Sequence, residues 1–148
     1  HTIPPHSSLL MKIISCRASR KIFVYNFLLI LVDVLSPQGE VMIFIVVKFK
    51  VKQDWASKWL DLVDEFTQLT RAEEGNLWFE WSQSCEDPST FVLVEAFTED
   101  GAVPHVNSDH FQEAMAKMPQ ALAETPKIIN TTIENANEWS LMGELSVE

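Results

Sequence analysis

Two histidines and an asparagine stand within a short polar stretch of the chain, at His105, Asn107 and His110. An imidazole titrates near neutral pH, so either histidine could take a proton from a substrate or hold it by a hydrogen bond. The amide of Asn107 could bind a substrate oxygen. In the alternative interpretation His110 and Asn107 cap a helix and His105 lies in a loop. We take all three as candidate catalytic residues.

Two carboxyl groups could contribute to the same chemistry. Glu80 and Glu95 lie on neighbouring segments that alternate between apolar and polar residues. A carboxyl group on a buried sheet face has a raised pKa and can act as a base. If either group faces solvent, or pairs with Lys48, it is structural.

Aromatic side chains surround these carboxyl groups in the sequence. Trp78 and Trp81 could form flat walls for an aromatic ring, but strand alternation points them to opposite faces, so at most one lines a given pocket. Core packing is the other interpretation for both, and it is the simplest one for Phe97. The candidate substrate-binding set is therefore Trp78, Glu80, Trp81, Glu95 and Phe97.

The elements that position these residues follow from hydrophobic periodicity. Alternating or β-branched runs predict strands at 43–51, 76–84, 90–97 and 127–133. Apolar residues at three- and four-residue steps predict one helix from an Asp54 cap to Gly75. A second helix is predicted from Ser108 or Asp109 to Pro126, with Phe111, Met115, Met118 and Leu122 as its buried stripe. The order β-α-β-β-α-β is an α+β, ferredoxin-like split motif.

This arrangement leaves one face of the sheet without helices. Both faces of the segment 76–84 carry aromatic residues, which indicates that the helix-free face is buried as well. Pairing two sheets across a two-fold axis would bury it, so we expect a homodimer. The apolar C-terminal tail could cross to the partner.

Charge and composition exclude several classes of partner. Residues 42–148 hold seven Lys/Arg and nineteen Asp/Glu, a net charge of −12, so we expect neither nucleic acid nor an anionic membrane as a partner. The two cysteines suggest no disulfide framework, and no Cys/His cluster suggests a metal. There is no GxGxxG, P-loop or HExxH motif. We therefore expect no cofactor and no metal.

The first forty-one residues differ in character from the rest. A basic stretch precedes an apolar run at 22–35, as in a signal peptide, but the run contains Asn26 and Asp33. We expect Met42 to be the natural start and residues 1–41 to be a non-core extension, vector-derived or mis-annotated. A targeting or anchoring segment and an integral extra element are the alternatives. The domain is then 42–148, and we expect it to be cytoplasmic.

Three motifs stand in order over about ninety residues: Glu73-Glu74-Gly75 before an aromatic strand, the hairpin Asp87–Glu95, and His105–Phe111 entering the second helix. Together they resemble the antibiotic biosynthesis monooxygenase (ABM) family. The resemblance implies a dimeric α+β barrel. It also implies a monooxygenase without cofactors that deprotonates a quinol-like or polyketide-like aromatic, with His105 or His110 as base, for direct reaction with dioxygen.

The family also contains haem-degrading enzymes and an isomerase of a phosphorylated sugar. The places at which the haem-degrading branch has Asn, Trp and His hold Val47 or Lys48, Phe97 and Met115 here, which argues against haem. The alternatives that remain are an isomerase of a small carbonyl compound and a non-catalytic dimeric module that binds a small ligand or responds to stress.

Overall fold

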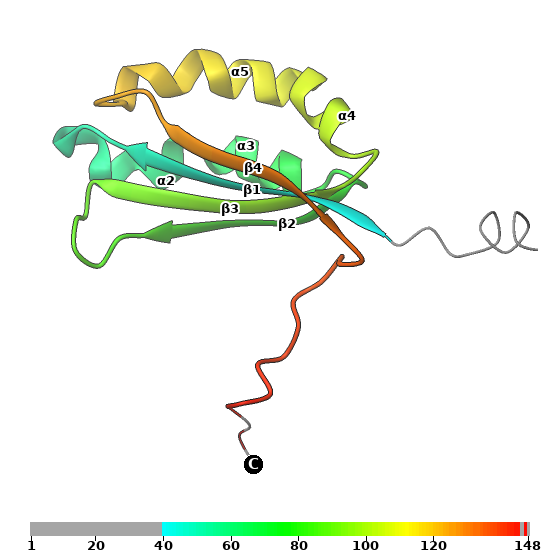
Figure 1. Ribbon diagram of the computed structural model, residues 1–148. Coiled ribbons are helices and arrows are strands. Elements are labelled where there is room, and N and C mark those ends of the chain that lie inside the picture. The colour runs from blue at the N-terminus through cyan, green and yellow to red at the C-terminus, as the bar shows by residue number, and fades with distance from the viewer. Residues whose placement is uncertain (1–39, 146, 148) are drawn as a thin grey trace, which may run out of the picture. The chain divides into compact units, whose positions relative to one another are not determined.

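The computed structural model describes residues 40–145 and 147, and these form a four-stranded antiparallel sheet with helices on one face (Figure 1). The strands are β1 (Val41–Lys50), β2 (Asn76–Gln83), β3 (Thr90–Thr98) and β4 (Lys127–Glu134), in the order β2-β3-β1-β4. All four predicted strands are confirmed, with bounds that differ by at most two residues. The predicted N-terminal extension lies outside the described residues except at its end, where Val41 already pairs with Glu134.

The first helical region differs from its prediction as one continuous helix. It consists of a 3-10 helix η1 (Gln53–Lys58), α2 (Trp59–Leu62) and α3 (Asp64–Arg71). Asp54 lies in the first turn of η1 and makes no cap, because Lys52 occupies the cap position without a side-chain hydrogen bond. The helix is interrupted at Val63, yet Trp59, Val63 and Phe66 all remain buried, so the apolar periodicity runs through the break and conceals it.

The second helical region contains a helix that was not predicted. α4 (Ala102–Asn107) carries His105, which had been expected in a loop. Pro104 is accommodated there because the first turn of a helix needs no backbone N–H donors. α5 (Asp109–Lys117) begins at a Ser108 cap, as predicted, whose hydroxyl accepts a hydrogen bond from the Phe111 amide at 3.2 Å. The helix was predicted to continue to Pro126, but it gives way to η2 (Met118–Ala121) at Pro119, which lacks the N–H that an α-helix needs.

An aromatic cluster under the helices forms the centre of the core. The Trp59 side chain is fully buried, and its ring lies 5.2 Å from Phe49, 5.8 Å from Trp81 and 6.1 Å from Phe91, measured between centroids. These residues come from α2 and three adjacent strands. The cluster therefore fixes the helical layer on the sheet, and with it the side chains described below.

The opposite face of the sheet is apolar and has no helical cover in the described chain. Val46 is paired with Val94 on one side and with Ile129 on the other, and Ile129 is 69% exposed. Trp78 also lies on this face, where its ring packs against Phe44 and against Trp139 of the C-terminal tail. Among the described residues, no helix is both long and apolar enough to cross a membrane.

Candidate functional site

An apolar cavity of about 330 Å³ lies between the helix-covered face of the sheet and α5. Such a volume accommodates a small organic molecule. Its polar lining groups are Glu95 and His105. The other lining residues are apolar: Val47, Phe49, Phe66, Leu93, Phe111, Met115, Met118, Pro119, Leu122, Pro126 and Ile128.

Glu95 reaches this cavity from β3. It stands opposite Ile45 in the register and shares its face of the strand with Leu93 and Phe97. The residue is 6% exposed, and its Oε2 has no hydrogen-bond partner among residues 40–145 and 147. Burial, and secondarily the negative charge of Glu73, raise the pKa of Glu95 to about 7. A carboxyl group in this state exchanges a proton readily at neutral pH.

His105 reaches the cavity from α4 and is 4% exposed. Its ring packs against Phe97 at 4.6 Å and Phe111 at 5.1 Å between centroids. Nδ1 lies 3.0 and 3.1 Å from the two carboxylate oxygens of Glu73. An ionised carboxylate only accepts hydrogen bonds, so Nδ1 carries the hydrogen and Nε2 is left as an acceptor.

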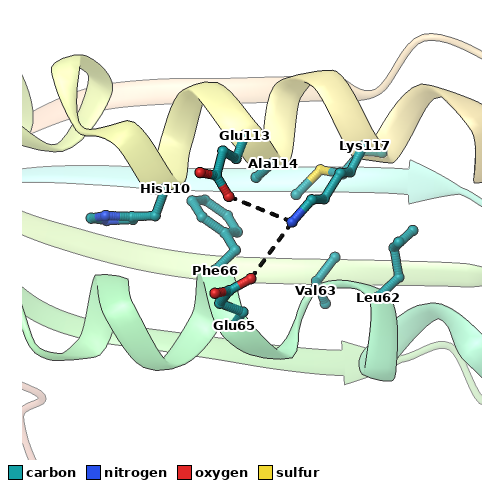
Figure 2. A pocket seen from close by; sticks show the side chains of 9 residues that line it. Leu62, Val63, Glu65, Phe66, His110, Glu113, Ala114 and Lys117 are labelled. Carbon is teal, nitrogen blue, oxygen red and sulfur yellow. Dashed lines mark hydrogen bonds and ion pairs between the residues drawn. The ribbon is translucent and has the colours of Figure 1, made fainter.

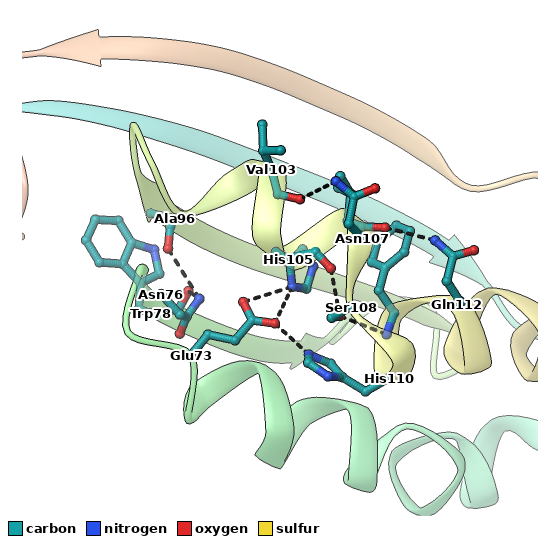
Figure 3. Close-up of polar contacts among 12 residues, drawn as sticks. Glu73, Asn76, Trp78, Ala96, Val103, His105, Asn107, Ser108, His110 and Gln112 are labelled. Atoms are coloured by element: carbon teal, nitrogen blue, oxygen red, sulfur yellow. Dashed lines mark hydrogen bonds and ion pairs between the residues drawn. The ribbon is translucent and has the colours of Figure 1, made fainter.

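Glu73 also binds the second histidine. Nε2 of His110 lies 2.5 Å from Oε1 of Glu73, so one carboxylate joins the two imidazoles, as Figure 3 shows. Glu73 precedes β2, whereas His105 and His110 belong to α4 and α5. Residues from three segments therefore meet in one polar cluster under the helices.

A contact between two glycines holds this cluster together. Gly75 and Gly101 approach so closely that a Cβ added to Gly101 would lie 2.6 Å from the Gly75 carbonyl oxygen. The same carbonyl accepts a hydrogen bond from the Thr98 amide at 2.9 Å. The turn that carries Glu73 is thus fixed against the start of α4, which carries His105.

Comparison with known proteins places this geometry in a family. The model of the family described as "Antibiotic biosynthesis monooxygenase" matches residues 42–117, just over half of the chain. The chain belongs to this family. The ABM domain therefore includes β1 to α5 and every residue of the Glu73, Glu95, His105 and His110 set.

Individual relatives agree with this assignment. The chain is 28% identical over 93 residues to "Putative monooxygenase YcnE" of Bacillus subtilis, covering 62% of this chain and 98% of that protein. Among solved structures it is similar to a "Putative antibiotic biosynthesis monooxygenase from Nitrosomonas europaea", with 28% identity, a TM-score of 0.58, and coverage of 66% of this chain and 93% of that one. An equally named protein from Caulobacter crescentus gives 25% identity and a TM-score of 0.56, with coverage of 67% and 93%.

Within this ABM domain, the structure brings together some of the predicted site residues. Glu95 and His105 share the cavity, and His110 joins His105 through Glu73. Phe97 is fully buried behind the His105 ring. Sequence reasoning missed Glu73 as a site residue, although it stands in the turn motif that carries the family resemblance.

The other candidates lie away from the cavity. The Asn107 amide donates to the Val103 carbonyl at 2.9 Å and is exposed on α4. Trp81 lies in the core, where its indole N–H donates to the Thr67 hydroxyl at 2.9 Å. Trp78 and Glu80 belong to the helix-free side of the sheet, where Glu80 pairs with Val94 and is exposed. A role for these residues in substrate binding stays a prediction.

A second hollow, between α3 and α5, is too small for a substrate. Its volume is about 20 Å³, roughly that of one water molecule. Figure 2 shows Lys117 above it, bridging Glu65 at 3.6 Å and Glu113 at 3.5 Å. Of the residues that the structure describes, no lysine or arginine lines the larger cavity, which gives a phosphorylated substrate no cationic partner there.

Proposed function

We propose that this ABM domain is a monooxygenase that needs no cofactor and acts on a small quinol-like aromatic substrate. The observation that carries the proposal is the apolar cavity into which one carboxyl group with a pKa of about 7 and one oriented imidazole project. Apolar walls favour a flat aromatic ring, and the two polar groups suit its hydroxyl groups. Membership of a family named for monooxygenases supports the reaction class.

Direct reaction with dioxygen requires a substrate that supplies the electrons itself. In the proposed reaction, Glu95 takes the proton of a ring hydroxyl, and the resulting anion passes one electron to O2. A C–O bond then forms at a ring carbon that bears hydrogen, and Glu95 returns its proton to the distal peroxide oxygen. The O–O bond breaks, the C–H electrons form a C=O bond, and the ring proton leaves with the hydroxide as water. One oxygen atom enters the product, one leaves in water, and Glu95 is regenerated.

His105 and Glu73 have supporting roles in this proposal. With its hydrogen held on Nδ1 by Glu73, His105 presents Nε2 as an acceptor for a second substrate hydroxyl. Glu73 acts through His105 and is a positioning residue. The base is assigned to Glu95 rather than to a histidine because Glu95 is the cavity group whose acceptor oxygen lacks a partner among the described residues.

Oxygen consumption tests the function. Chelator-treated, flavin-free protein is expected to consume O2 well above the spontaneous rate with at least one class among hydroquinones, anthrones and enolisable ketones. The stoichiometry should be one O2 per substrate, with one labelled atom entering the product from ¹⁸O2. Turnover that persists without oxygen would favour an isomerase, and tight binding without turnover would favour the ligand-binding module.

We also propose that the helix-free face of the sheet pairs with a second copy of the chain. Placing a glutamate at Val94 would bury two facing charges at such an interface, which is strongly destabilising. We expect the natural chain to sediment as a dimer and Val94→Glu to sediment as a monomer. Leu60→Glu is the matched control, because Leu60 belongs to the helical layer and is 51% exposed. A monomeric natural chain, or a dimer that survives Val94→Glu, would contradict the proposal.

A further inference from the structure

We propose that Glu73, His105 and His110 bind a divalent transition-metal ion, for which Zn²⁺ and Co²⁺ are the appropriate probes. One carboxylate oxygen, Nδ1 of His105 and Nε2 of His110 all lie within 4.8 Å of one another (Figure 3). The sequence gave no sign of a metal site, because Glu73 stands 32 and 37 residues from its two partners.

The donor atoms suit such an ion. Two imidazoles and one carboxylate form the three-ligand set of catalytic zinc sites and of the facial triad of non-haem iron, and both leave positions for water. Around a tetrahedral zinc, ligand atoms are separated by roughly 3.3 Å. The His105–Glu73 distance of 3.0 Å is close to this value, and the His110–Glu73 distance of 2.5 Å has to widen by about 1 Å.

The surroundings favour a cation as well. The side chains of His105, Glu73 and His110 are 5%, 17% and 17% exposed, so the cluster is largely shielded but can still be reached from solvent. The contact between Gly75 and Gly101 and the ring packing of His105 hold two of the ligands in place before an ion arrives. Glu95 adds a second carboxyl group nearby, and the domain is strongly acidic.

Metal binding would change the cavity. An imidazole that ligates through Nδ1 keeps its hydrogen on Nε2. His105 would then offer the cavity a donor in place of an acceptor, so a bound ion would invert the hydrogen bond available to a substrate. This consequence rests on the proposed function, whereas the metal site does not. We infer that the ion inhibits oxygenation.

Titration of the metal-free full chain with Co²⁺ tests the site without turnover. The natural chain is expected to bind one Co²⁺ with intense visible absorption of low coordination number, which Zn²⁺ abolishes by displacement. His110→Ala and Glu73→Gln are expected to weaken that binding at least tenfold. Glu74→Gln is the matched control, since Glu74 is exposed beside Glu73, and it should bind like the natural chain.

The spectral comparison separates this site from adventitious binding elsewhere, including at His1 and His6. Absorption that persists in both Glu73→Gln and His110→Ala would overturn the proposal, and so would a natural chain without the absorption. Circular dichroism of each variant establishes that it is folded. If Co²⁺ binds as expected but no substrate is oxidised, the metal site stands and the proposed function fails.

Discussion

Replacing Glu95 with glutamine is expected to lower kcat for oxygenation by about 10²–10⁴-fold, the usual contribution of a general base. Glutamine keeps the shape of the side chain but cannot accept a proton from the substrate. Initial rates of oxygen consumption at pH 8 measure the loss. Glu99→Gln is the matched control, because Glu99 is exposed just beyond the end of β3. A Glu95→Gln enzyme with the natural rate would remove Glu95 from the reaction.

The same residue predicts opposite effects of pH on activity and on stability. Activity needs the ionised carboxylate, so the rate should rise through pH 7 and then level off, and this limb should be absent in Glu95→Gln. The folded-state pKa is raised from 4.5 to about 7, so the folded protein holds its proton more tightly than the unfolded chain does. The free energy of unfolding therefore falls as the pH rises from about 4.5 to about 7.

Glu95→Gln removes this loss of stability. Relative to the natural chain, the variant should gain on the order of 3 kcal/mol of unfolding free energy between pH 4 and pH 8. Urea unfolding at the two pH values measures the difference. A variant that is inactive yet more stable at high pH cannot owe its inactivity to misfolding. Equal pH dependence in both proteins would contradict the raised pKa.

Replacing His105 with alanine is expected to lower kcat/KM by about 10–100-fold, the effect of losing one hydrogen bond to a charged or ionising group. The change removes the Nε2 acceptor and leaves Glu73 bound only to His110. Because the removed ring packs against Phe97 and Phe111, some stability will also be lost. Steady-state kinetics, together with thermal unfolding, separate the two effects.

Chemical rescue sharpens this test. The truncation leaves a space of the shape of an imidazole beside the cavity, so added imidazole should restore part of the activity of His105→Ala. It should have no such effect on Glu95→Gln. If the folded His105→Ala enzyme keeps its natural kcat/KM, then His105 serves packing alone.

The strands were predictable because their signal is local. Alternation along β3 places Glu95 on the same side as Phe91, Leu93 and Phe97, so its burial follows once the helix-covered side is known. The sequence could not tell which side that was, because β2 is aromatic on both. Glu80 and Glu95 were therefore equivalent candidates until the structure placed Glu95 under the helices and Glu80 on the opposite side.

The cluster at Glu73 could not be predicted in the same way. It depends on α4, whose single turn and a half contains a proline and no apolar repeat long enough to show periodicity. It also depends on the meeting of segments that are distant in the sequence. Only the packing of the turn before β2 against the start of α4 brings Glu73 to His105.

That packing has a consequence for how the domain can vary. Gly75 and Gly101 each occupy the space that a side chain on the other would need, although neither lines the cavity. A mutation that adds a side chain at either position separates the two backbones, and no substitution at the other can make room, since glycine is already the smallest residue. The pair is thus closed to compensation. Lineages that alter the substrate can change the cavity walls freely while inheriting these two glycines unaltered.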